Sequence, residues 1–156
     1  MRIMATIPLL VLAALIGAAG PSAAETIRAD QPDSVVRALQ SAGYRAALKT
    51  DEVGDPMIES ASSGKEFAVF FYGCKNNAAC SSVQFFAGYG KKASLEHLNA
   101  WNRDNRFGRA YRADNEFSRI EMDVDLDDGG MSEALFHDNL EYWAVVMAAF
   151  EKHIAD

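Results

Sequence analysis

Residue types that build metal or catalytic centres are sparse in this chain of 156 residues. It has two cysteines and three histidines, and His97, His137 and His153 lack the paired spacing of a zinc site. No Gly-rich phosphate loop opens a helix, and no G-x-S-x-G pattern marks a nucleophile. The sequence therefore predicts a protein that is not an enzyme and needs no metal or other cofactor.

Positive charge is also scarce. Lys and Arg number 15 against 22 Asp and Glu, which gives a net charge of −7. This excess of negative charge opposes attraction to nucleic acid and to anionic lipid. With 49% hydrophobic and 24% charged residues, the composition is typical of one soluble domain.

A long apolar stretch lies at the N-terminus. Arg2 precedes an uncharged run from Ile7 to Ala19, and Ser22-Ala23-Ala24 supplies the small residues that a signal peptidase recognises. A membrane-spanning helix needs about 20 apolar residues, whereas this run is shorter and Gly20-Pro21 interrupts it. We predict a signal peptide at residues 1–24, cleaved after Ala24. The mature domain, residues 25–156, is then periplasmic or secreted, without stable membrane insertion.

Cys74 and Cys80 lie in a short loop between two apolar runs, Phe67–Tyr72 and Val83–Ala87. An even, closely spaced pair in an exported protein indicates a disulfide. Closing so short a loop stabilises by about 2 kcal/mol in the chain-entropy model. The alternatives are a redox couple, which usually has C-x-x-C spacing, and a metal site, which would need two further ligands.

Apolar periodicity and turn signals predict an α+β fold. Helices are expected at residues 33–42, 94–104 and 132–154, strands at 44–49, 57–60, 66–72, 82–89, 107–113 and 117–126, and no regular structure at 25–31. The order α-ββββ-α-ββ-α predicts a single domain with an antiparallel sheet flanked by helices. The strand at 66–72 is almost wholly apolar, so we expect it at the sheet centre.

Aromatic, amide and guanidinium groups are concentrated between residues 98 and 111. Asn is a poor helix former, so its repetition here indicates side-chain hydrogen bonds. The amides either tie the helix end to neighbouring loops or line a groove that grips a polypeptide or a small polar ligand. For the second case the candidate partner-binding residues are Trp101, Asn102, Asn105, Arg106 and Tyr111. Arg106 would then pair with a carboxylate.

Carboxylates are dense between residues 121 and 128. An EF-hand loop beginning at Asp123 would need Gly at its sixth position and Glu at its twelfth, where the chain has Asp128 and Ala134. The calcium motif therefore fails. Strand alternation places Glu121, Asp123, Asp125 and Asp127 on one face, which we expect to be solvated.

The motifs Asp55–Ile58, Phe70–Cys74 and Leu98–Arg103, followed by Asn105–Phe107 and Tyr111, together resemble the YbjN-like family, described as bacterial sensory transduction regulators. The resemblance covers nearly the whole predicted mature domain. It implies an α+β fold similar to type III secretion chaperones, small proteins that often dimerise and bind partner polypeptides. It implies no established enzyme activity.

Together these observations predict a periplasmic, non-enzymatic binding or regulatory module. It engages an unidentified polypeptide partner through the sheet or through the Trp101–Tyr111 surface. Homodimerisation is an expectation from the fold analogy alone. A small-ligand sensor domain and an envelope enzyme without a recognisable motif are the alternatives.

Export determines where the protein accumulates. Cells expressing the full chain should release it with the periplasmic fraction, and its mature N-terminus should be Glu25, because cleavage follows Ala24. Cell fractionation and N-terminal sequencing measure both. Recovery of uncleaved chain from the cytosol alone would contradict the prediction.

Overall fold

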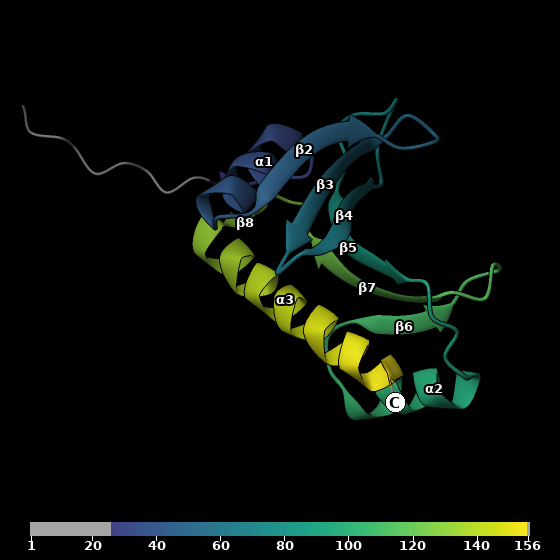
Figure 1. Ribbon diagram of the computed structural model, residues 1–156. Helices are drawn as coiled ribbons and strands as arrows, with labels where there is room; N and C mark the ends of the chain where they lie inside the picture. Colours follow the sequence, from purple (N-terminus) through teal and green to yellow (C-terminus); the bar gives the residue numbers. More distant parts are fainter. Residues whose placement is uncertain (1–25, 156) are drawn as a thin grey trace, which may run out of the picture.

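A six-stranded antiparallel sheet and a long C-terminal helix dominate the structure, a computed structural model that describes residues 26–155 (Figure 1). The helices are α1 (Pro32–Ser41), α2 (Leu95–Asp104) and α3 (Glu133–Ala155). The strands are β1 (Thr26–Ile27), β2 (Arg45–Thr50), β3 (Pro56–Ser62), β4 (Lys65–Tyr72), β5 (Ser82–Tyr89), β6 (Arg109–Arg112), β7 (Ser118–Asp125) and β8 (Met131–Ser132). The predicted α+β class is confirmed, and the order of the helices and larger strands matches. The predicted signal peptide lies outside the described residues.

The large sheet has the strand order β2-β3-β4-β5-β7-β6, and every neighbouring pair is antiparallel. β4 and β5 occupy the two central positions, which confirms the central place expected for the apolar strand. Phe67, Val69 and Phe71 of β4 are buried. Because successive strand residues point to opposite faces, Phe70 and Tyr72 lie on the other side of the sheet.

Packing of α3 against one face of the sheet forms the core. Trp143 of α3 stacks on Phe85 of β5 with ring centroids 5.8 Å apart and meets Phe67 of β4 at 6.1 Å. Trp143 and Phe85 are fully buried. Burial of each large apolar side chain stabilises the fold by about 1.5–3 kcal/mol. This aromatic cluster therefore fixes the position of α3 on the sheet.

The two shorter helices lie near opposite ends of α3 and contact it (Figure 1). Val35 and Leu39 of α1 and Leu98 and Trp101 of α2 are buried, so each short helix adds its apolar stripe to the same core. Ser94 caps α2, because its hydroxyl oxygen accepts a hydrogen bond from the His97 amide at 3.1 Å. No helix of residues 26–155 combines the length and apolar character needed to cross a membrane.

The expectation of no regular structure at residues 25–31 is wrong for residues 26–27, whereas residues 28–31 lie in no helix or strand. Thr26 and Ile27 form β1, which pairs with Ser132 and Met131 of β8. Ile27 and Ala29 are fully buried, so two apolar side chains in a polar segment provide the driving force for docking. A two-residue strand is too short to produce a recognisable periodicity.

A disulfide between Cys74 and Cys80 closes the loop between β4 and β5, as predicted. Cys80 is buried among the core residues, and Cys74 packs against them. At the base of the loop the Ser81 amide donates a hydrogen bond to the Tyr72 carbonyl at 2.9 Å. The disulfide and this hydrogen bond together close the loop that connects β4 to β5.

A glycine between α2 and β6 approaches α3 closely. Gly108 has φ +82°, and a Cβ atom there would lie 2.6 Å from Cγ1 of Val146. Gly64 has a similar φ of +80°, but nothing lies within 4 Å of its Cβ position. We expect Gly64→Ala to lower the free energy of unfolding by about 1 kcal/mol, the cost of left-handed backbone. Gly108→Ala should lower it by about 2–4 kcal/mol, because overpacking is added.

Urea unfolding of the two variants measures this difference. The Gly64→Ala protein is the matched control for backbone conformation, so the excess loss in Gly108→Ala reports the contact with Val146. Equal losses in both variants would contradict the close approach of the α2–β6 connection to α3.

Candidate functional site

One face of the sheet is left open. The three helices gather on the other face, where α1 and α2 both contact α3 (Figure 1). Within residues 26–155 no helix covers the opposite side, which we call the open face. Strand alternation and register place on it Arg45, Lys49, Met57, Glu59, Ala68, Phe70, Tyr72, Gln84, Phe86, Arg109, Tyr111, Arg119, Glu121, Asp123 and Asp125.

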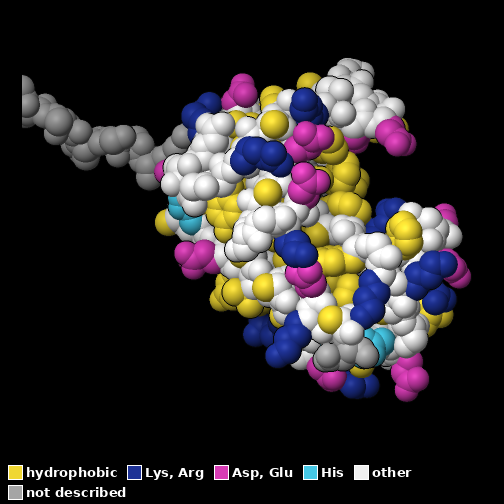
Figure 2. Space-filling model, in the orientation of Figure 1, with side chains coloured by type: hydrophobic (Ala, Val, Ile, Leu, Met, Phe, Trp, Pro, Cys, Tyr) yellow, Lys and Arg dark blue, Asp and Glu magenta, His cyan; other side chains and the backbone are white. Residues whose placement is uncertain are grey.

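Three apolar side chains form the floor of the open face. Met57 of β3 lies opposite Phe70 of β4 in the register, and the Phe70 ring meets Phe86 of β5 edge-on at 5.5 Å. All three are only half-buried. Hydrophobic side chains gather in the hollow that Figure 2 shows in this part of the molecule. A contiguous apolar surface of this kind is typical of a binding site.

Charges of opposite sign border this floor. Arg45 and Lys49 lie on the edge strand β2, whereas Asp123 and Asp125 lie on β7. All four side chains belong to exposed residues. The guanidinium carbon of Arg119 lies 5.4 Å from the centre of the Phe86 ring, within cation–π range. Both signs of charge nevertheless occur on each side of the floor, because Arg45 pairs with the exposed Glu66 at 3.7 Å and the guanidinium groups of Arg109 and Arg119 belong to the β6–β7 side.

A buried carboxylate lies under the β6 side of the open face. Glu121 is 6% exposed. It accepts a hydrogen bond from Nη2 of Arg109 at 2.6 Å and another from the Tyr111 hydroxyl. The hydrogen bond to Glu121 raises the pKa of Arg109, and burial followed by that same carboxylate raises the pKa of Tyr111.

The expectation of a solvated acidic face is therefore wrong for Glu121. Strand alternation assigns this residue to the correct face, but its carboxylate is covered by side chains from the neighbouring strand β6. Arg109 lies directly opposite Glu121 in the register, and Tyr111 lies opposite Arg119. Asp123 and Asp125 are exposed, as predicted.

A second polar chain crosses the middle of the open face. Nε2 of Gln84 donates to Oδ1 of Asp123 at 2.8 Å, and the Tyr72 hydroxyl donates to Oε1 of Gln84 at 3.4 Å. Burial raises the pKa of Tyr72, and the charges of Glu121, Asp123 and Asp51 raise it further. The Tyr72 end of the open face is therefore electronegative.

The amides predicted between residues 98 and 111 bond within the domain. Oδ1 of Asn102 accepts from the Ala110 amide at 2.8 Å, and Nδ2 of Asn102 donates to the Ala110 carbonyl at 2.9 Å. Nδ2 of Asn105 donates to the Trp101 carbonyl at 3.0 Å. The buried Trp101 donates its indole N–H to the Gly108 carbonyl at 3.1 Å. These contacts match the interpretation in which the amides tie the helix end to its neighbours.

The structure does not bring the five candidate residues onto one surface. Tyr111 lies on the open face, whereas Arg106 lies over the Phe107 ring with its guanidinium carbon 5.2 Å from the ring centre. Phe107 in turn stacks on Tyr142 of α3 at 4.6 Å. Trp101 and Asn102 connect α2 to the start of β6, and Asn105 bonds to Trp101 at the C-terminal end of α2. Sequence reasoning missed Met57, Phe70 and Phe86, although apolar residues at alternate positions of a strand with a buried opposite face were a signal for them.

Two histidines that are distant in the sequence meet in the fold. The rings of His97 in α2 and His153 in α3 lie 4.2 Å apart. Nε2 of each lies within hydrogen-bond distance of the other residue's backbone carbonyl, at 2.6 Å and 2.9 Å. The pair therefore joins α2 to the last turn of α3. Across residues 26–155, no group of three or more His, Cys, Asp or Glu residues is placed to hold a metal ion.

Comparison with known proteins adds the family. The sequence model of YbjN, described as "Putative bacterial sensory transduction regulator", matches residues 31–156. The chain belongs to the YbjN family. Searches of curated proteins and of solved structures give no match. The YbjN match contains the whole open face and all five candidate partner-binding residues.

Loss of the Asn102 side chain should destabilise this YbjN domain. Asn102→Ala leaves both backbone groups of the buried Ala110 without these partners, so we expect the free energy of unfolding to fall by about 2–3 kcal/mol. Arg106→Ala removes an exposed side chain and should cost less than about 1 kcal/mol. Urea unfolding of both variants and of the parent measures these free energies of unfolding. An Asn102→Ala protein as stable as the parent would show that this amide is free to bind a partner.

Proposed function

We propose that this domain is a non-enzymatic regulatory binding module that engages a polypeptide partner on its open face. The observation that carries the proposal is the apolar floor of Met57, Phe70 and Phe86, which lies half-buried at the centre of a sheet whose other face is packed. A domain that needed this face only for solubility would carry polar side chains there. The family description as a sensory transduction regulator supports a binding role.

The polar groups around the floor support binding more than catalysis. The Glu121 carboxylate accepts hydrogen bonds from Arg109 and Tyr111, and Asp123 accepts one from Gln84. A general base needs a carboxylate directed at a substrate proton, whereas both of these carboxylates bond to neighbouring side chains. Their role in the proposal is to hold Arg109, Tyr111 and Gln84 in position around the floor.

The dimensions of the open face favour a polypeptide over a small ligand. Five inter-strand steps separate β2 from β6, and at about 4.8 Å each the face is about 24 Å wide. Charges of both signs surround the floor, so a partner segment would carry acidic and basic residues around an apolar centre.

The Trp101–Tyr111 segment contributes to this surface in two ways. In the proposal Tyr111 contacts the partner directly, whereas Arg106, which lies over the Phe107 ring on the α3 side, is not part of the contact surface. Trp101 and Asn102 act as positioning residues, because their hydrogen bonds connect α2 to the start of β6. Asn105 bonds to the Trp101 carbonyl and so holds the C-terminal end of α2. The proposal includes the predicted export to the periplasm, an oxidising compartment that favours the disulfide between Cys74 and Cys80.

Charge placed on the apolar floor should abolish partner binding. We propose crosslinking capture from periplasmic extract with residues 25–156 as bait, comparing the parent with Phe70→Lys. Val145→Lys is the matched control, because Val145 is 67% exposed on α3. A polypeptide crosslinked by the parent and by Val145→Lys should be lost with Phe70→Lys, since the new ammonium group would be desolvated on binding.

Circular dichroism must first show that both variants fold. Retention of the same polypeptide by Phe70→Lys would contradict the open face as the binding site. If neither parent nor control captures a polypeptide, native mass spectrometry of freshly purified protein tests the small-ligand alternative. A retained ligand mass would then replace the polypeptide proposal.

A further inference from the structure

The disulfide loop has a left-handed backbone at three residues other than Gly. Asn76, Asn77 and Ala79 have φ values of 54°, 58° and 47°, all in the left-handed region. Asn76 and Asn77 suit this backbone, because they form a two-residue turn closed by two hydrogen bonds between the backbone groups of Lys75 and Ala78. Ala79 does not favour it, so the disulfide is needed to hold this turn in place at the end of the β4–β5 hairpin.

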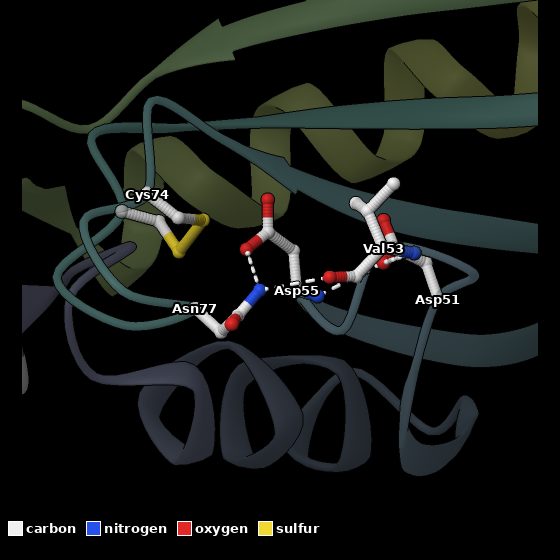
Figure 3. The surroundings of a disulfide bond; sticks show 6 residues. Asp51, Val53, Asp55, Cys74 and Asn77 are labelled. Carbon is white, nitrogen blue, oxygen red and sulfur yellow. Dashed lines mark hydrogen bonds between the residues drawn. A yellow bond between two sulfur atoms is a disulfide. The ribbon is translucent and has the colours of Figure 1, made fainter.

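The loop uses one of these residues to contact a second turn. Nδ2 of Asn77 donates to the Val53 carbonyl at 3.0 Å and to Oδ1 of Asp55 at 2.9 Å, as Figure 3 shows. Gly54 lies against the same amide, since a Cβ on Gly54 would be 3.1 Å from Nδ2 of Asn77. Asn77 therefore fastens the β2–β3 turn to the disulfide loop.

The β2–β3 turn in turn shapes one end of the open face. Asp51, Glu52 and Val53 line a cavity together with Met57, Phe70 and Tyr72. Two of these residues, Met57 and Phe70, belong to the apolar floor. Within the turn Oδ1 of Asp51 accepts hydrogen bonds from the amides of Val53 and Asp55. These bonds keep the turn folded. The hydrogen bonds of Asn77 connect the turn to the neighbouring β4–β5 hairpin.

We propose that the Cys74–Cys80 disulfide is a redox-sensitive latch that holds the β2–β3 turn through Asn77 and so sets the shape of the partner-binding surface. The inference rests on the proposed function, because it assigns regulation to the open face. In the oxidised protein the Tyr72 end of the open face is formed. In the reduced protein the loop relaxes, the Asn77 contacts are lost and the turn moves independently of β4 and β5.

The chemistry is a thiol–disulfide exchange with a dithiol reductant. A thiolate of the reductant attacks Sγ of Cys74, the more exposed of the two cysteines, and the S–S bond breaks with its electron pair on Sγ of Cys80. The Cys80 thiolate takes a proton. The second thiol of the reductant then displaces Cys74 as a thiolate, which is also protonated. The protein gains two electrons and two protons, and the reductant becomes a disulfide.

Hydrogen exchange of backbone amides tests the latch without a partner. In the oxidised chain the amides of Asp51, Val53, Gly54 and Asp55 all donate hydrogen bonds in the turn. After reduction with dithiothreitol we expect these amides to exchange at least about tenfold faster. Amides in the centre of β5 and β7 should be unchanged.

Two variants provide the matched comparison in the oxidised state. Asn77→Ala should reproduce the faster exchange of the turn, whereas Asn76→Ala should not, although both replace a left-handed Asn by Ala. No change in the turn on reduction would overturn the latch. An equal rise across the whole domain would overturn it too, because the disulfide would then be a general staple.

The result is independent of the partner experiment. Exchange that follows the prediction, with no polypeptide captured by the oxidised protein, would retain the latch and reject the proposed function. Where a polypeptide is captured, its crosslinking yield should fall in the reduced protein and in Asn77→Ala but not in Asn76→Ala. An undiminished crosslinking yield in the reduced protein and in Asn77→Ala would show that the latch does not affect partner binding. That result would overturn the regulatory part of the inference.

Discussion

The stacking of Trp143 on Phe85 is the interaction on which the architecture depends. It fixes a single helix, about 35 Å long at 1.5 Å per residue, across one face of a six-stranded sheet. Because α1 and α2 pack against this same helix, their apolar stripes serve one core. On the opposite face, polar and charged side chains must make the surface compatible with water. The floor of Met57, Phe70 and Phe86 is apolar, and polar or charged residues of the large sheet surround it.

Two polar arrangements fix the β6 side of that open face. The exposed Asn102 bonds to both the amide and the carbonyl of the buried Ala110, as a neighbouring strand would, so α2 pairs these two backbone groups at one edge of the sheet. Glu121 pairs with Arg109 and Tyr111 from the adjacent strand. An unpaired carboxylate at that depth would be costly. The two arrangements together explain why Tyr111 has a defined position on a short edge strand.

Local signals in the sequence were sufficient for much of the fold. Apolar runs identified β4 and β5, apolar periodicity identified α2 and α3, and the close pair of cysteines between two apolar runs indicated the Cys74–Cys80 disulfide. Long-range contacts were not available from such patterns. Alternation shows that Glu121 lies on the same face of the sheet as Asp123 and Asp125. Its burial depends on the pairing of β6 with β7 at the edge of the sheet. The amides around Asn102 suit either a structural or a binding role, and only their contact with Ala110 distinguishes the two.

The two sides of the open face are held by different chemistry. At β6 the contacts are hydrogen bonds and an ion pair between residues of adjacent elements, which respond to pH and salt but not to thiols. At the β2–β3 turn the contacts pass through Asn77 to a loop closed by a covalent bond. A change in thiol redox state therefore acts on one side and leaves the other in place. Such asymmetry would change the shape of the binding surface while the Trp143–Phe85 core, and with it the fold, stays intact.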